Sequence, residues 1–128
     1  MNTNLNIVPY KIAKKLKECG FFYLCDYYFD SEGNIKRSDE FKDWNSDENV
    51  ISAPYAFVVQ QWLSNEHNVD VFACRLSNIT SPMLGYTYAI FHDGSVEPIT
   101  GTIPEESIDV ALIKGIEYFC ETVEINRA

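Results

Sequence analysis

The chain has 128 residues, a length that suits one domain with one hydrophobic core. Hydrophobic residues make up 46% of it and charged residues 23%, so the composition excludes an intrinsically disordered chain. The net charge of −9 makes direct nucleic-acid binding unfavourable, because such affinity normally comes from Lys and Arg that neutralise phosphates.

The first predicted element is a helix over residues 9–19. Pro9 suits a first helical turn, apolar residues then recur at helical spacing, and Gly20 can adopt the left-handed conformation that closes a helix. The opposite face carries four lysines, namely Lys11, Lys14, Lys15 and Lys17. This local basic stripe could contact an acidic partner, but such a stripe is more often a solvated helix face.

A β-hairpin and an acidic loop are predicted next. The aromatic stretch 21–29 favours a strand, DSEGN supplies turn residues, and the short stretch IKR returns. Residues 38–50 are polar, acidic and without a sustained period, so they predict a loop with room for a helical turn around Phe41 and Trp44.

A well-specified helix is predicted over residues 53–67. Ser52 suits its N-cap, Pro54 is tolerated in its first turn, and Asn68 can end it. One side of this helix should face a sheet through a stripe of Tyr55, Val58, Val59, Trp62 and Leu63.

Two strands follow, over residues 69–76 and 85–92, and a turn then leads into the stretch VEPIT. Pro98 confines that last stretch to a sheet edge or an irregular strand, because proline cannot donate to the hydrogen-bond ladder.

The closing helix is predicted over residues 103–122. Thr102 and Glu105 have the spacing of a capping box. Helical spacing continues through Ile108, Ala111, Leu112, Ile116 and Phe119. The order α-β-β-α-β-β-α over residues 1–128 therefore predicts a single α+β domain, with an antiparallel sheet and helices packed mainly on one face.

Three stretches taken in order resemble a known group of proteins. They are IAKKLKECGF near the start, ISAPYAFVVQQWL before a strand, and the acidic closing helix. This pattern resembles small uncharacterised proteins carried by prophages and conjugative elements of gut bacteria. The resemblance implies an accessory protein of a mobile element, and it implies no catalytic or binding residue.

Catalytic and cofactor-binding patterns are missing from the sequence. His67 and His92 fall at a helix end and at a turn, where both have structural roles. Asp30, Glu32 and Asn34 alternate as calcium ligands do, but the glycine and the closing glutamate are misplaced. We expect no metal, no cofactor and no catalytic residue, although a cofactor-free hydrolase stays open as an alternative.

The start of the chain has no signal-peptide pattern, and no apolar run suits a membrane span, so we expect a cytoplasmic protein that makes no use of a membrane. The four cysteines agree with a reducing compartment, since Cys19, Cys25, Cys74 and Cys120 are irregularly spaced in apolar segments.

Aromatic residues make up 14% of the chain and indicate a contact surface. In the strand GYTYAIFH, alternation places Tyr86, Tyr88 and Ile90 on one side, and we expect this side to form a homo-oligomer interface or to dock another protein. The alternative is a mimic of DNA that inhibits a host nucleic-acid-binding protein. This second hypothesis requires the acids of residues 30–48 and of the closing helix to form one surface.

Overall fold

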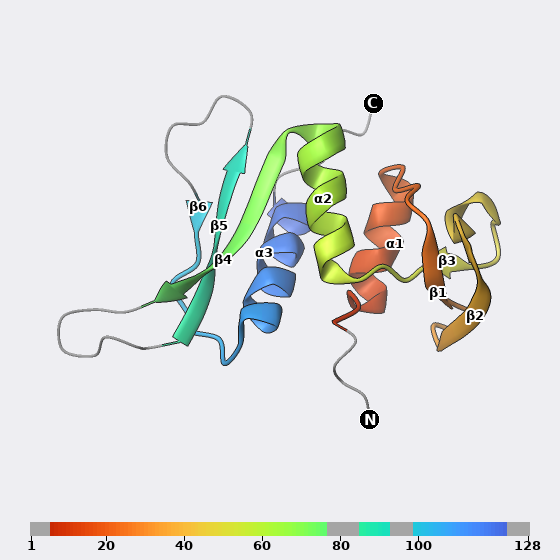
Figure 1. Ribbon diagram of the computed structural model, residues 1–128, viewed down its shortest axis with the longest axis horizontal. Helices are drawn as coiled ribbons and strands as arrows, with labels where there is room; N and C mark the ends of the chain where they lie inside the picture. Colours follow the sequence, from red (N-terminus) through yellow and green to blue (C-terminus); the bar gives the residue numbers. More distant parts are fainter. Residues whose placement is uncertain (1–5, 77–84, 93–98, 123–128) are drawn as a thin grey trace.

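The computed structural model of the protein describes residues 6–76, 85–92 and 99–122. Within these ranges, two small antiparallel sheets lie at opposite ends, with three α-helices between them (Figure 1). The elements in chain order are α1 (Tyr10–Glu18), β1 (Cys25–Phe29), β2 (Ile35–Lys42), the short 3-10 helix η2 (Trp44–Ser46), β3 (Ile51–Ser52), α2 (Ala56–His67), β4 (Val69–Leu76), β5 (Gly85–His92), β6 (Ile99–Thr100) and α3 (Ile108–Thr122).

The predicted α+β class and the order α-β-β-α-β-β-α are confirmed. The one antiparallel sheet that we expected is two sheets, with strand orders β2-β1-β3 (the first sheet) and β4-β5-β6 (the second sheet). Each hairpin has a third, two-residue strand of its own: β3, which the sequence did not predict, pairs with β1, and β6 pairs with β5. The β1–β2 and β4–β5 hairpins therefore belong to different sheets, and the helices lie between these two sheets (Figure 1).

Helix α1 agrees with its prediction. Pro9 is its N-cap residue, and the chain leaves the helix through Gly20, whose φ of +89° is a conformation that glycine adopts without strain. Its buried side consists of Ile12, Ala13 and Leu16.

The first hairpin differs from its prediction at both ends. Strand β1 begins at Cys25 rather than at residue 21, because Phe21 is buried against Trp62, with ring centroids 5.2 Å apart. Strand β2 extends to Lys42, so the predicted loop 38–50 loses its first five residues to the strand. The helical turn is confirmed at Trp44, in η2, whereas Phe41 belongs to β2.

The turn between β1 and β2 accounts for the calcium-like spacing of its residues. The Asp30 carboxylate accepts hydrogen bonds from the backbone N–H groups of Glu32 and Asn34, both at 2.9 Å. Gly33 supplies the positive φ of +84° that the turn requires. The acidic run therefore shapes a hairpin.

Helix α2 begins three residues later than predicted. Ser52 does not cap it, because Ser52 pairs with Tyr28 in the first sheet and its hydroxyl accepts a hydrogen bond from the Trp44 N–H at 3.1 Å. The predicted end is confirmed, since Asn68 has left-handed backbone angles of φ 57° and ψ 40°. Of the predicted stripe, Val59, Trp62 and Leu63 are buried, whereas Tyr55 and Val58 are half-buried.

Helix α3 begins at Ile108, and the predicted capping box at Thr102 is wrong. Glu105 instead extends the edge of the second sheet, because its backbone exchanges two hydrogen bonds with Tyr86, at 2.7 and 3.0 Å. The cap is Ser107, whose hydroxyl accepts a hydrogen bond from the Val110 N–H at 3.1 Å.

The second sheet confirms both predicted long strands and the edge position of the last one. Val71 lies opposite Ile90 in the β4–β5 ladder, and β6 forms the edge as Ile99–Thr100. The loop at 77–84, Pro98 and the turn that follows His92 lie outside the described residues.

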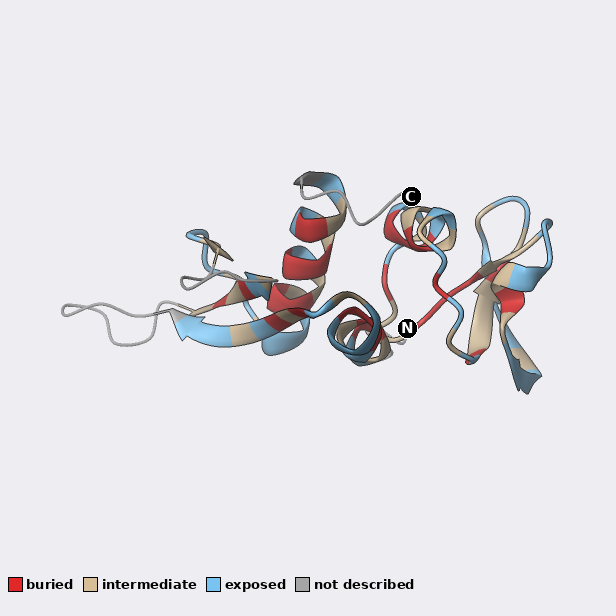
Figure 2. Cartoon of the chain, turned by 90° about the horizontal axis from the view of Figure 1, so that it is seen from above, coloured by how far each residue is buried: buried red, intermediate tan, exposed pale blue. Residues whose placement is uncertain are grey.

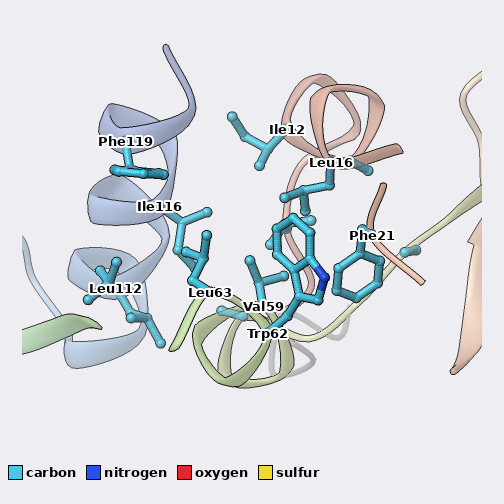
Figure 3. Close-up of a cluster of buried hydrophobic side chains, with 14 of the residues drawn as sticks. Ile12, Leu16, Phe21, Val59, Trp62, Leu63, Leu112, Ile116 and Phe119 are labelled. Atoms are coloured by element: carbon cyan, nitrogen blue, oxygen red, sulfur yellow. The ribbon is translucent and has the colours of Figure 1, made fainter. Parts of the chain in front are cut away.

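The core lies where the three helices meet. Figure 3 shows side chains from α1, α2 and α3 and from the segment after α1 pointing toward one another; they are Ile12, Leu16, Phe21, Val59, Trp62, Leu63, Leu112, Ile116 and Phe119. Figure 2 shows the same concentration of buried residues on the facing sides of the helices. The predicted burial of Trp62, Leu112 and Ile116 is confirmed.

Candidate functional site

The predicted contact residues on β5 lie on the side of the second sheet that α3 covers. Ile90 is fully buried and belongs to the core, so it cannot contact a partner in this fold. Tyr88 is half-buried, and its ring lies 5.8 Å from that of Tyr118 on α3. A Cβ at Gly115 would lie 2.8 Å from the Cβ of Tyr88, so glycine permits this close approach of helix and strand. The three predicted residues therefore do not form one exposed surface.

The opposite face of the second sheet carries the exposed aromatic side chains. Phe72 on β4 is 46% exposed and Phe91 on β5 is 38% exposed, and their rings meet edge to face at 6.1 Å. They alternate with the buried residues Val71 and Ile90, which places them on the other side of the strands. An aromatic strand surface therefore exists, built by residues other than those that alternation suggested.

A larger exposed apolar region lies between α2 and the first sheet. We call it the apolar groove, which has a volume of about 450 Å³ and is lined by Phe22, Tyr23, Leu24, Phe41, Val58 and Gln61. Three of these side chains are largely exposed: Phe41 by 64%, Phe22 by 50% and Leu24 by 49%. The lining contains no charged side chain, although the whole chain carries a net charge of −9.

The segment before β1 supplies one wall of the apolar groove through simple alternation. Phe21 and Cys25 are buried, so Phe22 and Leu24 between them face outward. Tyr23 is held against α2, since its hydroxyl accepts a hydrogen bond from the Asn65 side chain at 3.1 Å. The wall is thus fixed by the burial of Phe21 and Cys25 and by this exposed hydrogen bond to α2.

A bulge in β2 presents Phe41 at the groove. Tyr27 pairs with Arg37 and Cys25 pairs with Lys42, so one residue of β1 faces four residues of β2 between these pairs. The Ser38 hydroxyl accepts a hydrogen bond from the Glu40 N–H at 2.9 Å within this bulge. The extra residues explain why Phe41 is so exposed and why sequence periodicity did not indicate it.

A second, polar pocket of about 450 Å³ lies between α3 and the edge of the second sheet. Tyr88 and Tyr118 form its aromatic part, and Glu105 and Lys114 are among its charged lining residues. Burial is the main cause that raises the pKa of Tyr88, and the nearby Tyr118 and Glu105 raise it further. The Tyr88 phenol therefore stays protonated at neutral pH and is not a ready base or nucleophile.

The cysteines and histidines do not assemble a catalytic group in these pockets. Burial raises the pKa of both Cys25 and Cys120 to about 12, so both thiols are protonated at neutral pH. Neither His67 nor His92 lines the apolar groove or the polar pocket, and the His67 ring packs against Trp62 at 4.6 Å.

The described ranges contain neither a cluster of metal ligands nor a membrane-spanning helix. Across residues 6–76, 85–92 and 99–122, no three His, Cys, Asp or Glu side chains come together as metal ligands would. None of the helices in these ranges is both long and apolar enough to cross a membrane.

The basic stripe of α1 contacts other parts of the chain. Lys11 forms ion pairs with Glu117 at 3.1 Å and with Glu121 at 3.0 Å, both on α3. Lys17 donates hydrogen bonds to the backbone carbonyls of Asp47 and Val50 at 2.8 and 2.7 Å. Lys11 and Lys14 are nevertheless exposed, as a solvated helix face predicts, so the stripe faces solvent while two of its lysines also make contacts within the fold.

The two acidic regions are separated in space. Residues 30–48 lie around the first sheet, α3 lies beside the second sheet, and α1 lies between them (Figure 1). Because Lys11 also pairs with two acids of α3, the described acidic residues do not make the single negative surface that a DNA mimic requires.

Comparisons of this chain with protein-family models, with curated proteins and with solved structures find no match.

Proposed function

We propose that this protein is a protein-interaction module that docks a partner protein through the apolar groove. The observation that carries the proposal is the exposure of Phe22, Leu24 and Phe41 around an uncharged groove in an otherwise acidic chain. Exposed apolar patches of this kind mark binding surfaces, whereas scattered single residues do not.

The groove can supply binding energy on the scale of an interface hot spot. Complete burial of a Leu or Phe side chain is worth about 1.5–3 kcal/mol, so three half-exposed side chains can still contribute about 2–4 kcal/mol. Their contribution needs no rearrangement, because the groove is already formed between α2 and the first sheet.

The groove supports this function better than the two alternatives. A cofactor-free hydrolase would need a nucleophile beside a base; the apolar groove has no charged side chain to act as that base, and no cysteine or histidine lines the groove or the polar pocket. A DNA mimic would need its acids on one face, and α1 separates them.

The cellular setting is part of the same proposal. We place the protein in the cytoplasm because its irregularly spaced cysteines agree with a reducing compartment. Its role as an accessory protein of a prophage or conjugative element rests on the sequence resemblance alone. Integration or conjugation genes beside its gene, and recovery in the cytoplasmic fraction, would support this setting. Ordinary chromosomal neighbours would contradict it.

Photo-crosslinking in living cells tests the docking proposal. The reactive amino acid is introduced as Phe41→benzoylphenylalanine, with Phe72→benzoylphenylalanine as the matched control on the second sheet. We expect a defined protein adduct from position 41, and its loss when Leu24→Asp is added. No adduct from position 41, or the same adducts from both positions, would contradict docking through the groove.

A further inference from the structure

We infer that the outer edge of β4 binds an extended segment of a partner protein as an additional strand. This surface is separate from the apolar groove, and the inference does not depend on docking through the groove. The second sheet has the order β4-β5-β6, so β4 is paired on one side only. A strand at a sheet edge presents backbone N–H and C=O groups that pair with another extended chain.

The hydrogen bonds of β5 show which residues of β4 direct their backbone groups outward. Tyr86 exchanges two backbone hydrogen bonds with Glu105, so its N–H and C=O groups point away from β4. In an antiparallel pair, two opposite residues either bond each other or both point away. Arg75 lies opposite Tyr86, so its backbone groups point to the outer edge. The direction alternates along a strand, so those of Ala73 do the same.

A side chain of α2 agrees with this direction and marks where the open edge begins. Gln60 donates a hydrogen bond to the Val71 carbonyl at 2.7 Å, and Val71 alternates in step with Ala73 and Arg75. In Figure 1, α2 lies beside the beginning of β4, and the end of the strand extends past the helices. Within the described residues, no hydrogen bond reaches the outer backbone groups of Ala73 and Arg75.

The edge of β4 lacks the protection that the other edge strands have. Short length, bulges and charged side chains are the means by which proteins prevent unwanted strand pairing. Strands β3 and β6 have two residues each. Strand β2 is bulged and carries five exposed charged side chains, namely Lys36, Arg37, Asp39, Glu40 and Lys42. Strand β4 instead pairs with β5 without interruption over its eight residues, and it exposes Phe72 and Cys74.

Two side chains of β4 define the chemistry of the bound segment. Arg75 is exposed and forms no ion pair with another described residue, so an acidic residue opposite it gives charge complementarity. Phe72 is 46% exposed on the other face and favours an apolar residue opposite it. The segment therefore carries an acidic and an apolar residue three positions apart, as Phe72 and Arg75 are.

A second copy of β4 does not supply this acid. Its acidic residue, Asp70, alternates with the residues whose backbone groups point outward. Because outward-pointing residues pair only with one another across the new ladder, no register of β4 with itself places Asp70 opposite Arg75. The charge of the edge thus favours a segment of a different protein.

Selection from a phage-displayed library of random linear peptides, with the whole protein as the target, tests the inference. We expect enriched peptides with an acidic and an apolar residue three positions apart and no proline between them. Arg75→Glu should weaken binding of a synthetic enriched peptide at least about fivefold, and changing the peptide's acid to lysine should restore binding to this variant. Arg37→Glu, at the exposed edge of β2, is the matched control and should leave binding unchanged.

Methylation of the peptide backbone separates strand addition from docking of side chains alone. Only every second amide of an added strand faces β4, so N-methyl groups should abolish binding at alternate positions and have little effect between them. Amide resonances of Ala73 and Arg75 should change on titration, whereas those of the apolar groove should not. Circular dichroism and thermal melting check that both arginine variants are folded.

Several results would overturn the inference. They are a selection without enrichment, an Arg75→Glu variant that binds like the wild type, an equal effect of N-methylation at all positions, and resonance changes in the groove instead of β4. A wild-type dimer joined through β4 would replace the partner segment by a second copy. None of these results bears on the apolar groove, which is tested by crosslinking from position 41; an adduct from position 72 should contain a different protein.

Discussion

At the scale of single residues, burial controls how reactive each cysteine is. The pKa of Cys25 and that of Cys120 rise to about 12, in both cases mainly because burial disfavours the thiolate. Cys74 is exposed on β4. No disulfide links the four cysteines, which agrees with the irregular spacing in the sequence.

We expect Cys74 to react with a thiol reagent before Cys25 and Cys120 in the folded protein at neutral pH. A raised pKa lowers the thiolate fraction at any given pH, and the thiolate is the reactive species. Mass spectrometry of protein labelled for increasing times, followed by peptide mapping, gives the order.

Cys74→Ser serves as the control and should remove the fast labelling phase. In denaturant, Cys25 and Cys120 should label as quickly as Cys74. Early labelling of Cys25 in the folded protein would contradict its burial in the first sheet.

A non-local contact sets the start of α3 at the scale of secondary-structure elements. The sequence predicted Thr102 as the start because Glu105 completes a capping box. The structure uses Ser107, since the backbone of Glu105 is already paired with Tyr86. A non-local sheet contact thus overrode the local capping signal at Thr102.

We expect Ser107→Ala to lower the free energy of unfolding by about 0.5–2 kcal/mol, the usual cost of removing an N-cap. Thr102→Ala should change it by much less, because Thr102 is exposed and precedes the helix by six residues. Urea denaturation of both variants measures the difference. The reverse order of the two effects would show that α3 begins at the position predicted from sequence.

At the scale of the whole molecule, the core formed by the three helices connects the two sheets. Trp62 on α2 is buried among side chains from the segment after α1 and from the helices, so its removal should weaken the connection between both ends. The other tryptophan, Trp44 in η2, lies against the first sheet and is stacked on Tyr28 of β1 with ring centroids 4.4 Å apart.

We expect Trp62→Ala to lower the free energy of unfolding by about 3–5 kcal/mol, as for other buried large aromatic residues. Phe57→Ala on the same helix should cost far less, because Phe57 is 56% exposed. Urea denaturation followed by circular dichroism measures both.

The remaining fluorophore in Trp62→Ala, Trp44, adds a test of the single-domain prediction. Its fluorescence should change together with the helical signal, in one transition. Two separate transitions would mean that the first sheet unfolds by itself.

The candidate site was only partly accessible from the sequence. The high aromatic content could not indicate which aromatic side chains are exposed, because alternation within GYTYAIFH cannot tell which side a helix will cover. Gly115 allows α3 to approach Tyr88, so that side became the covered one, and Phe72 and Phe91 became the exposed pair. A signal for the apolar groove existed in the alternation of Phe22 and Leu24 with the buried Phe21 and Cys25.

Local spacing in the sequence by itself determined the α+β class and the order of the elements. It also determined the end of α2 at Asn68 and the burial of Trp62. The reason is that helices and strands depend on residues only a few positions apart. The tertiary structure decided the division into two sheets, the loss of Ser52 as a helix cap and the composition of the apolar groove. The groove joins Phe22, Phe41 and Val58 from three separate segments. Such contacts depend on how the segments pack, which no local pattern encodes.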